Sequence, residues 1–475
     1  MNLDLSLLMP ELAFLLLVAV LFMQAVGVGA QVAVQRWLPV GALLCTVVAA
    51  LSLATKGSMF YDTYRIDALS QFFKLVVTGG FAVTVLNATR QPTLEEGKRS
   101  DYFLFLAVSA WGLMLLASAT ELVTLYLALE LSSYSLYVLI PLRGRTKEGA
   151  EAGAKYVLFG AAATAISLYG LSYIIAAQHT TFISALALHN WTWAESPVAV
   201  LGLAMFLCGM FYKLALFPFH FWCPDVYQGA SNETAAYIAT LPKLGAVVVL
   251  IRLGALLQPG LEVTNAIAWL GVISMTFGNL CALAQKDLKR MLGFSSVAHA
   301  GYVTVGLVAG TPEGLGAAAF YALVYVVMNL LCFWVVSRVA VDGRNLVLTD
   351  LNGLHRRAPV LAFALAVGAF ALVGLPPTAG FMGKLFLITA AWNHGYNWLV
   401  IALALNTAIA IYYYLSMVRH AYTEPEQEQT TGPEPDQSAF SLGGAVLLAG
   451  FTLVLGLVPS TFYERAVAAG MALFG

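Results

Sequence analysis

Residues 198–222 read VAVLGLAMFLCGMFYKLALFPFHFW, an apolar run that contains both a charge and a helix breaker. About 20 consecutive apolar residues suffice to cross a bilayer as a helix. Lys213 nevertheless stands inside the run, and Pro218 follows shortly after it. A charge at the centre of a bilayer costs about 2.5–3.5 kcal/mol, and proline removes a backbone hydrogen bond. The run therefore predicts a membrane helix that is interrupted beside a buried lysine.

Apolar runs of similar length recur along the whole chain. Of its 475 residues, 60% are hydrophobic and 10% are charged, against about 25% charged in an average soluble protein. We therefore predict an all-α polytopic membrane protein of about 14 transmembrane helices with no separate soluble domain. The first run lacks a basic segment before it and reads as a retained helix and not as a signal peptide. The expected spans are 5–28, 38–54, 68–88, 102–118, 120–140, 152–177, 198–222, 233–255, 264–284, 291–310, 314–338, 359–393 (interrupted), 398–420 and 439–462.

The basic residues predict the orientation in the membrane. The chain has 24 lysines and arginines, and those in loops divide roughly 15 to 4 between the two sides. Arg90, Arg143, Lys289 and Arg357 all lie on the rich side. By the positive-inside rule that side is cytoplasmic, which puts both termini on the non-cytoplasmic face.

Two of the runs share a pattern that indicates an internal repeat. Gly209–Leu216 and Gly380–Leu387 both read Gly-x-x-x-Lys-Leu-x-Leu, and both lie beside prolines. The second lies five spans after the first, an odd number, so equivalent segments would cross the membrane in opposite directions, as in transporters with inverted repeats and broken helices. We predict two inverted five-helix repeats with helices 7 and 12 interrupted. A plain packing kink at each proline is the alternative.

The repeat divides the chain into five expected parts. They are the N-terminal helices 1–3 (1–101), the first antiporter-like half with helices 4–8 (102–255), the second, inverted half with helices 9–13 (264–421), an acidic flexible cytoplasmic loop (422–438), and a C-terminal transmembrane helix (439–475). The loop holds TEPEQEQTTGPEPDQ, which is too polar to fold alone. A solvated linker is the plain interpretation, and a docking segment is the alternative.

Four charged residues within apolar runs indicate proton or ion transport. Glu130 and Lys213 have opposite signs at similar depth and are expected to form an ion pair across two helices. A pair that opens and closes would switch how tightly Lys213 holds its proton; a static pair would only stabilise the bundle. Lys243, directly after Pro242, fits an intermediate site, and Lys384 a terminal one.

Further ionisable residues have more than one interpretation. His299, in SSVAHAGY, suits a proton shuttle because histidine titrates near neutrality, but it could equally be a packing residue. Lys155 and Lys74 lie nearer the ends of their spans, and their side chains could extend to the interface. His220 at the end of the seventh run has the same ambiguity.

The sequence contains no cofactor signature that we detect. The five cysteines are scattered without metal-ligand spacing and read as packing residues, and no phosphate-binding loop, haem ligand set or iron–sulfur ligand set appears. We expect no cofactor in this chain and no nucleic acid partner. Its energy must come from an ion gradient or from a partner subunit. The five cysteines are Cys45, Cys208, Cys223, Cys281 and Cys332.

Three segments make the chain resemble the antiporter-like membrane subunits of respiratory complex I, a family related to the Mrp-type sodium/proton antiporters. They are FPFHFWCPDVYQG (217–229), QKDLKRMLGFSSVAHAGY (285–302) and GLPPTAGFMGK (374–384). The resemblance covers essentially the whole chain. Among the three types of antiporter-like subunit, the lysine at position 384 resembles the N-type, because the M-type carries glutamate there. The length of the chain, without a long C-terminal lateral helix, differs from the L-type.

The resemblance implies roles for the residues already singled out. Glu130 and Lys213 match the family's switching ion pair, Lys243 its central lysine and Lys384 its terminal one, with Lys155 and His299 as accessory relay positions. It also implies partners: neighbouring antiporter-like and small membrane subunits in the lipid bilayer of a bacterial inner membrane, with flavin, iron–sulfur clusters and quinone held by other chains. The alternative is an Mrp-type antiporter driven only by ion gradients.

The chain departs from the family pattern at one place. The family commonly has Ala-Pro-Thr-Pro-Val after the Asp-Val-Tyr-x-Gly segment, whereas this chain has Ala230-Ser-Asn-Glu-Thr234. A loop without these prolines is expected to be less rigid, and it carries the charge of Glu233.

Overall fold

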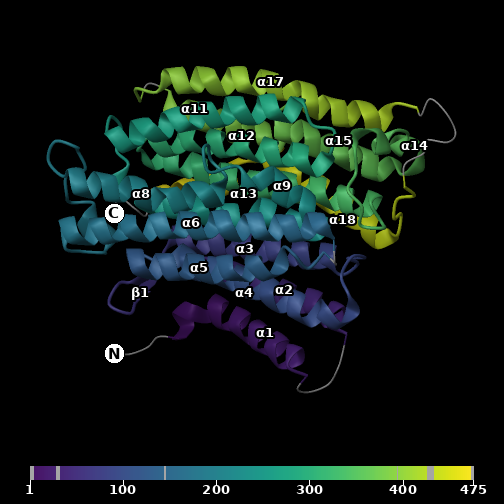
Figure 1. The fold of residues 1–475 in the computed structure, drawn as a ribbon, viewed down its shortest axis with the longest axis horizontal. Helices are drawn as coiled ribbons and strands as arrows, with labels where there is room; N and C mark the ends of the chain where they lie inside the picture. Colours follow the sequence, from purple (N-terminus) through teal and green to yellow (C-terminus); the bar gives the residue numbers. More distant parts are fainter. Residues whose placement is uncertain (1–4, 28–32, 144–145, 393, 425–432, 472–475) are drawn as a thin grey trace.

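The computed structural model describes residues 5–27, 33–143, 146–392, 394–424 and 433–471. The apolar runs form helices that lie side by side along one common direction (Figure 1). Within the described residues, 13 helices are long and apolar enough to cross a membrane, and two shorter apolar helices, α15 and α16, divide a further span between them. The predicted all-α membrane bundle of about 14 spans is confirmed.

The element bounds follow the predicted spans closely. In chain order they are η1 Leu5–Leu8, α1 Met9–Ala25, α2 Val34–Leu51, β1 Gly57–Met59, β2 Tyr64–Ile66, α3 Ala68–Ala88, η2 Glu96–Lys98, α4 Arg99–Ser118, α5 Leu122–Leu139, α6 Lys147–Gln178, α7 Ile183–Leu186, α8 Pro197–Leu214, α9 Trp222–Gly229, α10 Asn232–Arg252, η3 Leu253–Leu256, α11 Glu262–Leu283, α12 Leu288–Val308, α13 Pro312–Val339, η4 Leu348–Leu351, α14 Leu354–Arg357, α15 Pro359–Val373, α16 Ala379–Ala391, α17 Asn397–Tyr422, α18 Ala439–Leu457 and α19 Ser460–Met471.

Both expected interruptions are present, and the structure adds a third. Span 7 is divided into α8 and α9, and span 12 into α15 and α16. The last expected span is divided as well, because α18 ends at Leu457 and α19 begins at Ser460. Pro459 lies at this break; proline has no N–H and cannot continue a helix interior. The C-terminal segment therefore consists of two helices in succession.

Helices α10 and α13 form the centre of the bundle, enclosed by protein along their length. Around them the helices approach closely where side chains are small. A Cβ added at Gly170 of α6 would come within 2.5 Å of the Gly202 carbonyl oxygen of α8. Close backbone approach through small residues is how membrane helices associate without a hydrophobic driving force between them. Helix α1, by contrast, lies at the edge of the bundle (Figure 1).

A short β-hairpin and a buried ion pair hold this peripheral helix. Strands β1 and β2 pair antiparallel between α2 and α3, a feature that the sequence analysis did not predict. Lys74 of α3 does not extend to the interface; it is completely buried, and its Nζ lies 2.5 Å from Oε1 of Glu11 in α1. The Tyr64 hydroxyl of β2 donates to the same carboxylate oxygen at 2.6 Å. The expectation of an interfacial Lys74 was therefore wrong, because its partner Glu11 lies in a distant helix, α1.

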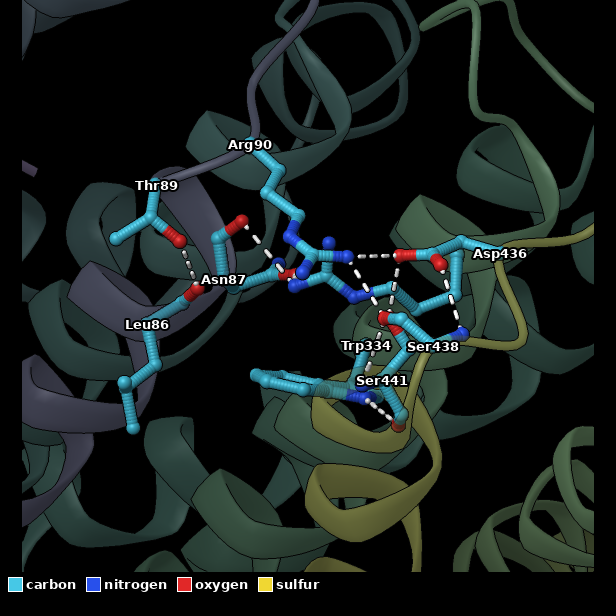
Figure 2. A network of polar contacts seen from close by, with 9 residues as sticks. Leu86, Asn87, Thr89, Arg90, Trp334, Asp436, Ser438 and Ser441 are labelled. Atoms are coloured by element: carbon cyan, nitrogen blue, oxygen red, sulfur yellow. Dashed lines mark hydrogen bonds and ion pairs between the residues drawn. The ribbon is translucent and has the colours of Figure 1, made fainter.

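The described part of the acidic segment is held by arginines. Residues 425–432, where a flexible loop was expected, lie outside the described residues, but residues 433–438 are in contact with the bundle. Arg90, just after α3, reaches Asp436 Oδ2 at 2.6 Å and Ser438 Oγ at 2.7 Å (Figure 2). The Asp436 amide donates to the Arg338 carbonyl at 2.8 Å, and Arg357 donates to the Pro433 carbonyl at 2.6 Å. This end of the segment is thus docked and not a free linker.

The protonation of Asp436 predicts how this docking depends on pH. Burial raises the pKa of Asp436, but hydrogen bonds from Ser441 and Ser438 and the nearby Arg90 outweigh it and lower the pKa to about 2. Because the folded pKa lies below the ordinary value of about 3.9, the stabilisation is complete above that value and is lost as pH falls toward 2.

We expect Asp436→Asn to loosen residues 436–441 at neutral pH. Hydrogen bonds to charged groups contribute roughly 1.5–3 kcal/mol, so backbone exchange there should rise by about tenfold or more. Hydrogen–deuterium exchange of the assembled protein at pH 7 measures this. Glu434→Gln, a change at an exposed residue of the same segment, is the matched control and should leave exchange unaltered. Equal exchange in all three proteins would contradict the docking role of Asp436.

Candidate functional site

Lys213 lies in the last turn of α8, directly before the break in span 7. The helix ends at Leu214, Ala215 adopts the left-handed conformation with φ of 61°, and the chain resumes as α9 at Trp222. The Lys213 side chain is buried, and its Nζ lies 5.4 Å from the ring centroids of both Tyr156 and Tyr212. Aromatic faces attract a cation, and more so away from water. The charge is thus held by ring faces at the end of a broken helix.

Glu130 of α5 faces the same small cavity as Lys213. Its Oε1 accepts a hydrogen bond from Thr164 Oγ1 at 3.0 Å, while its buried Oε2 has no partner among the described residues. The cavity measures about 10 Å³ and is lined by both charged side chains, which is about the space that one water molecule needs. The two groups face each other across this space and are not in direct ion-pair contact. The expected ion pair is therefore not formed in this structure, in which the two charged groups line one cavity without touching.

Lys243 lies at the centre of the bundle, on α10 directly after Pro242. Its Nζ donates to Ser296 Oγ of α12 and lies 3.6 Å from Cys223 Sγ of α9. Ser296 in turn bonds the hydroxyl of Tyr227 at 3.1 Å and that of Tyr325 of α13. Four helices thus meet at one ammonium group and one hydroxyl. Sequence analysis did not single out Ser296, because a serine in a span usually bonds its own backbone.

His299 continues this polar line one turn along α12. A small cavity of about 10 Å³ is lined by Lys243, Ser296 and His299 together. The histidine ring is completely enclosed and bonded at both nitrogens, by Tyr321 at 2.7 Å from Nδ1 and by Tyr414 at 3.1 Å from Nε2. Both ring nitrogens therefore have hydroxyl partners.

Lys384 ends the line in α16. Its Nζ donates to the Val373 carbonyl at 2.8 Å and to Thr407 Oγ1 of α17 at 3.2 Å, and it lies 4.3 Å from the ring centroid of Tyr302. Tyr302 also packs edge-on against the His299 ring, with 5.4 Å between ring centroids. Tyrosine side chains thus fill the space between the histidine and the terminal lysine.

Aromatic rings also separate the first two lysines. Lys213 lies against Tyr156 and Tyr212, whereas Lys243 lies 5.7 Å from the ring centroid of Trp222. Trp222 packs on both tyrosines, at 5.0 Å from Tyr156 and 5.4 Å from Tyr212 between ring centroids. The contact between these two sites is therefore a stack of rings, unlike the hydroxyl-lined contact between Lys243 and His299.

The structure corrects how the two lysine motifs correspond. The shared Gly-x-x-x-Lys-Leu-x-Leu pattern does not align at the breaks, because Lys213 precedes its break, in α8, whereas Lys384 follows its break, in α16. Lys384 nevertheless reaches back to the carbonyl of Val373, the last residue of α15. Both ammonium groups therefore lie at the C-terminal end of the first half-helix, where the helix dipole is negative and favours a cation.

Lys155 lies apart from this line, in a half-exposed cluster of charges. Its Nζ is 2.5 Å from Asp225 Oδ2 and 2.6 Å from Glu151 Oε1, and Asp225 also pairs with Arg290 at 2.5 Å. Asp225 stands in the first turn of α9, so these bonds fix that half-helix against α6 and α12. Sequence analysis missed Asp225 as a contact of Lys155, although it stands in the segment FPFHFWCPDVYQG.

His220 and the unusual 230–234 segment lie in different surroundings from those expected. His220 is buried against the rings of Phe217, Phe221 and Phe277 and takes no part in the polar line.

Ser231 caps α10 by accepting from the Thr234 amide at 3.1 Å, and the residues after it form the first helical turn. Glu233 is buried there. The expectation of a less rigid loop was wrong, because serine replaces proline as a helix start.

The cysteines remain unpaired, and within the described ranges no cluster of three or more histidine, cysteine or acidic side chains could hold a metal ion.

Comparison with known proteins identifies the family. The family model described as NADH:quinone oxidoreductase/Mrp antiporter, TM, matches residues 119–410. A relative from Solidesulfovibrio magneticus, NADH-quinone oxidoreductase subunit N 2, is 59% identical over 97% of this chain and 98% of its own length. The F(420)H(2) dehydrogenase subunit N of Methanosarcina mazei is 34% identical over 88% of this chain and 86% of its own length.

Solved structures agree in fold. A chain of respiratory complex I from Thermus thermophilus with bound aureothin superposes with a TM-score of 0.84 at 32% identity, over 97% of this chain and 100% of that one. A chain of the Mrp complex from Dietzia sp. has a TM-score of 0.86 at 19% identity, over 100% of this chain and 98% of that one, which is a likeness of fold alone. The chain therefore belongs to the family of NADH:quinone oxidoreductase/Mrp antiporter membrane subunits, and within it to the N-type subunits.

Proposed function

We propose that this chain is the proton-translocating N-type subunit of an NADH:quinone oxidoreductase, and that its protons pass through Glu130, Lys213, Lys243 and Lys384. The observation that carries the proposal is the row of buried lysine side chains Lys213, Lys243 and Lys384. Three ammonium groups lie within the bundle, two of them at the ends of broken helices and one at a shared serine hydroxyl. Intramembrane ionisable residues of this kind mark proton pathways.

The groups along the line differ in how they pass a proton. Between Lys243 and Lys384, serine, histidine and tyrosine groups both donate and accept, which is what a proton relay requires. His299 acts there as an accessory site. Lys155 acts as an accessory site at the half-exposed end of α6, where Asp225 and Glu151 hold it.

The open arrangement of Glu130 and Lys213 acts as the switch. Opening a pair from about 4 Å to about 10 Å costs roughly 2.5 kcal/mol at an effective dielectric constant of 20. At about 1.4 kcal/mol per factor of ten, this weakens the hold of the lysine on its proton by roughly 50–100-fold. A water molecule in the cavity between the two groups would bridge them in the open state. Closing the pair then holds the proton, and opening it releases the proton toward Lys243.

The redox chemistry belongs to other chains. We propose that flavin, iron–sulfur clusters and quinone are bound by partner subunits, and that this chain docks against neighbouring antiporter-like and small membrane subunits in the inner membrane of a bacterium. Both termini are proposed to lie on the non-cytoplasmic face, from the distribution of basic residues in the loops. An Mrp-type antiporter has the same fold, but relatives named as subunit N at 59% identity favour the redox-driven complex.

Glu130→Gln is the experiment that tests this function. The change keeps the bond with Thr164 but removes the negative charge, so the switch stalls and both pumping and electron transfer should fall by about tenfold or more. Quinone reductase activity and membrane potential are measured in the same vesicles, after assembly is verified on a native gel. Glu121→Gln, at another glutamate of the same region, which caps α5, is the control. Wild-type values of both activities in Glu130→Gln would leave Glu130 a structural residue.

A further inference from the structure

A sizeable cavity lies away from the polar line of Lys243, His299 and Lys384. It measures about 720 Å³ and runs between α3 on one side and α18 and α19 on the other, with α13 as its floor. Its walls are almost entirely apolar, and the residues that define its length include Leu75 and Val83 of α3, Val327 and Leu330 of α13, and Phe451 of α18. We call this cavity the α3–α19 groove.

The groove is long and apolar. Its lining on α3 extends from Ala68 to Val83, which at 1.5 Å per residue is about 22 Å. This length and the apolar lining suit a lipid acyl chain.

One cation lies at the end of the groove. Arg465 of α19 lines it together with Thr461 and is exposed. Two residues further along α19, Val467 packs against Gly316, near the first residue of α13, so Arg465 lies toward that end of the bundle. Within the described part of the chain, Arg465 has no hydrogen-bond or ion-pair partner. A guanidinium group binds phosphate oxygens with two parallel hydrogen bonds.

We propose that one phospholipid molecule occupies the α3–α19 groove, with its phosphate on Arg465 and an acyl chain along α3 and α13. The occupant matches the long apolar interior and the unpartnered cation at its end. It also has a structural consequence. Leu323, Val326 and Val327 form the floor of the groove, while Tyr321 and Tyr325 of the same helix bond His299 and Ser296. The lipid therefore supports the back of the helix that carries these tyrosines.

Photo-crosslinking in the complete complex tests the proposal. The complex is reconstituted in bilayers that contain phosphatidylglycerol with a photoactivatable diazirine in one acyl chain, irradiated, and mapped by mass spectrometry. We expect crosslinks on the α3 and α13 peptides that contain Leu75 and Val327. In Arg465→Gln these should fall at least severalfold, while Arg65→Gln, a change at an exposed arginine of β2 outside the groove, should leave them unchanged.

A second variant keeps the test decisive if Arg465→Gln fails to assemble. Gly79 lines the groove, and a Cβ added there meets only Thr46 Cγ2, at 3.9 Å. Gly79→Leu is therefore chosen to place a larger side chain in the groove. It should abolish the crosslinks while the complex assembles. Crosslinks that persist in Gly79→Leu, that are equal over the whole membrane surface, or that are replaced by contacts with a peptide of another subunit would overturn the proposal. Because binding is measured and not pumping, the result is independent of the proposed relay.

Discussion

Lys243→Met is expected to lower proton pumping by at least about tenfold while the complex still assembles, because proton-transfer groups contribute roughly 10²–10⁴-fold. Methionine keeps the length and the apolar stem of the side chain but deletes the group that donates to Ser296 and lies over Trp222 and Tyr227. Packing against these residues is therefore retained. Proton translocation per electron pair, measured in reconstituted vesicles, reports the loss.

Two further variants separate the proton of Lys243 from its bulk. Lys243→His restores a group that titrates near neutrality, and it should recover part of the activity with a displaced pH optimum. Lys98→Met, at a half-exposed lysine that pairs with Glu95, is the control and should pump normally. A methionine variant at position 243 that pumps like the wild type between pH 6 and 8 would remove Lys243 from the path.

Lys384→Met should stop pumping to a similar extent, and Lys384→Arg should assemble but also pump poorly. Arginine keeps the charge that the Val373 carbonyl and the Tyr302 ring stabilise, but it effectively never releases its proton. The same comparison applies to Lys213, whose charge is held by tyrosine rings.

The comparison of methionine with arginine distinguishes a proton site from a static cation. A cation that only stabilises the end of a half-helix is replaced by arginine without loss, because the helix dipole responds to charge alone. Membrane potential and quinone reduction are recorded together, at equal amounts of assembled complex. Full pumping by Lys384→Arg or Lys213→Arg would mean that the residue concerned serves only to stabilise the broken helix.

The sequence predicted the spans and two of the three interruptions because these depend on local composition. A run such as 198–222 is long and apolar enough to be recognised as a span. Its proline interrupts the helix regardless of which helices pack around that span. The third interruption at Pro459 was missed because the proline falls near the end of an apolar run, where a helix is expected to stop in any case. The hairpin at 57–66 was missed because its strands are only three residues each.

The contacts between distant residues could not be predicted in the same way. Lys74 and Glu11 are far apart in sequence, and neither has a local partner that marks it as buried. Ser296 and Tyr325 acquire their importance only because α10, α12 and α13 meet around Lys243. The match between the two lysine motifs correctly pointed to a lysine beside each helix break, but not to its position relative to the break. Lys384 follows its break and reaches back to the end of α15.

Helix α10 has a consequence for how the protein is made. It carries three buried charged residues, Glu233, Lys243 and Arg252. The partner of Arg252, Asp67, precedes α10 in the chain, whereas that of Lys243 follows it. Ser296, the hydroxyl partner of Lys243, is synthesised 53 residues later, which is a delay of about 3–10 s at roughly 5–20 residues per second. During that time a free α10 in lipid would bear the cost of an unpaired central charge. We therefore expect α10 to remain beside the nascent chain until α12 and α13 have emerged, so that this segment enters the bilayer as a group and not helix by helix.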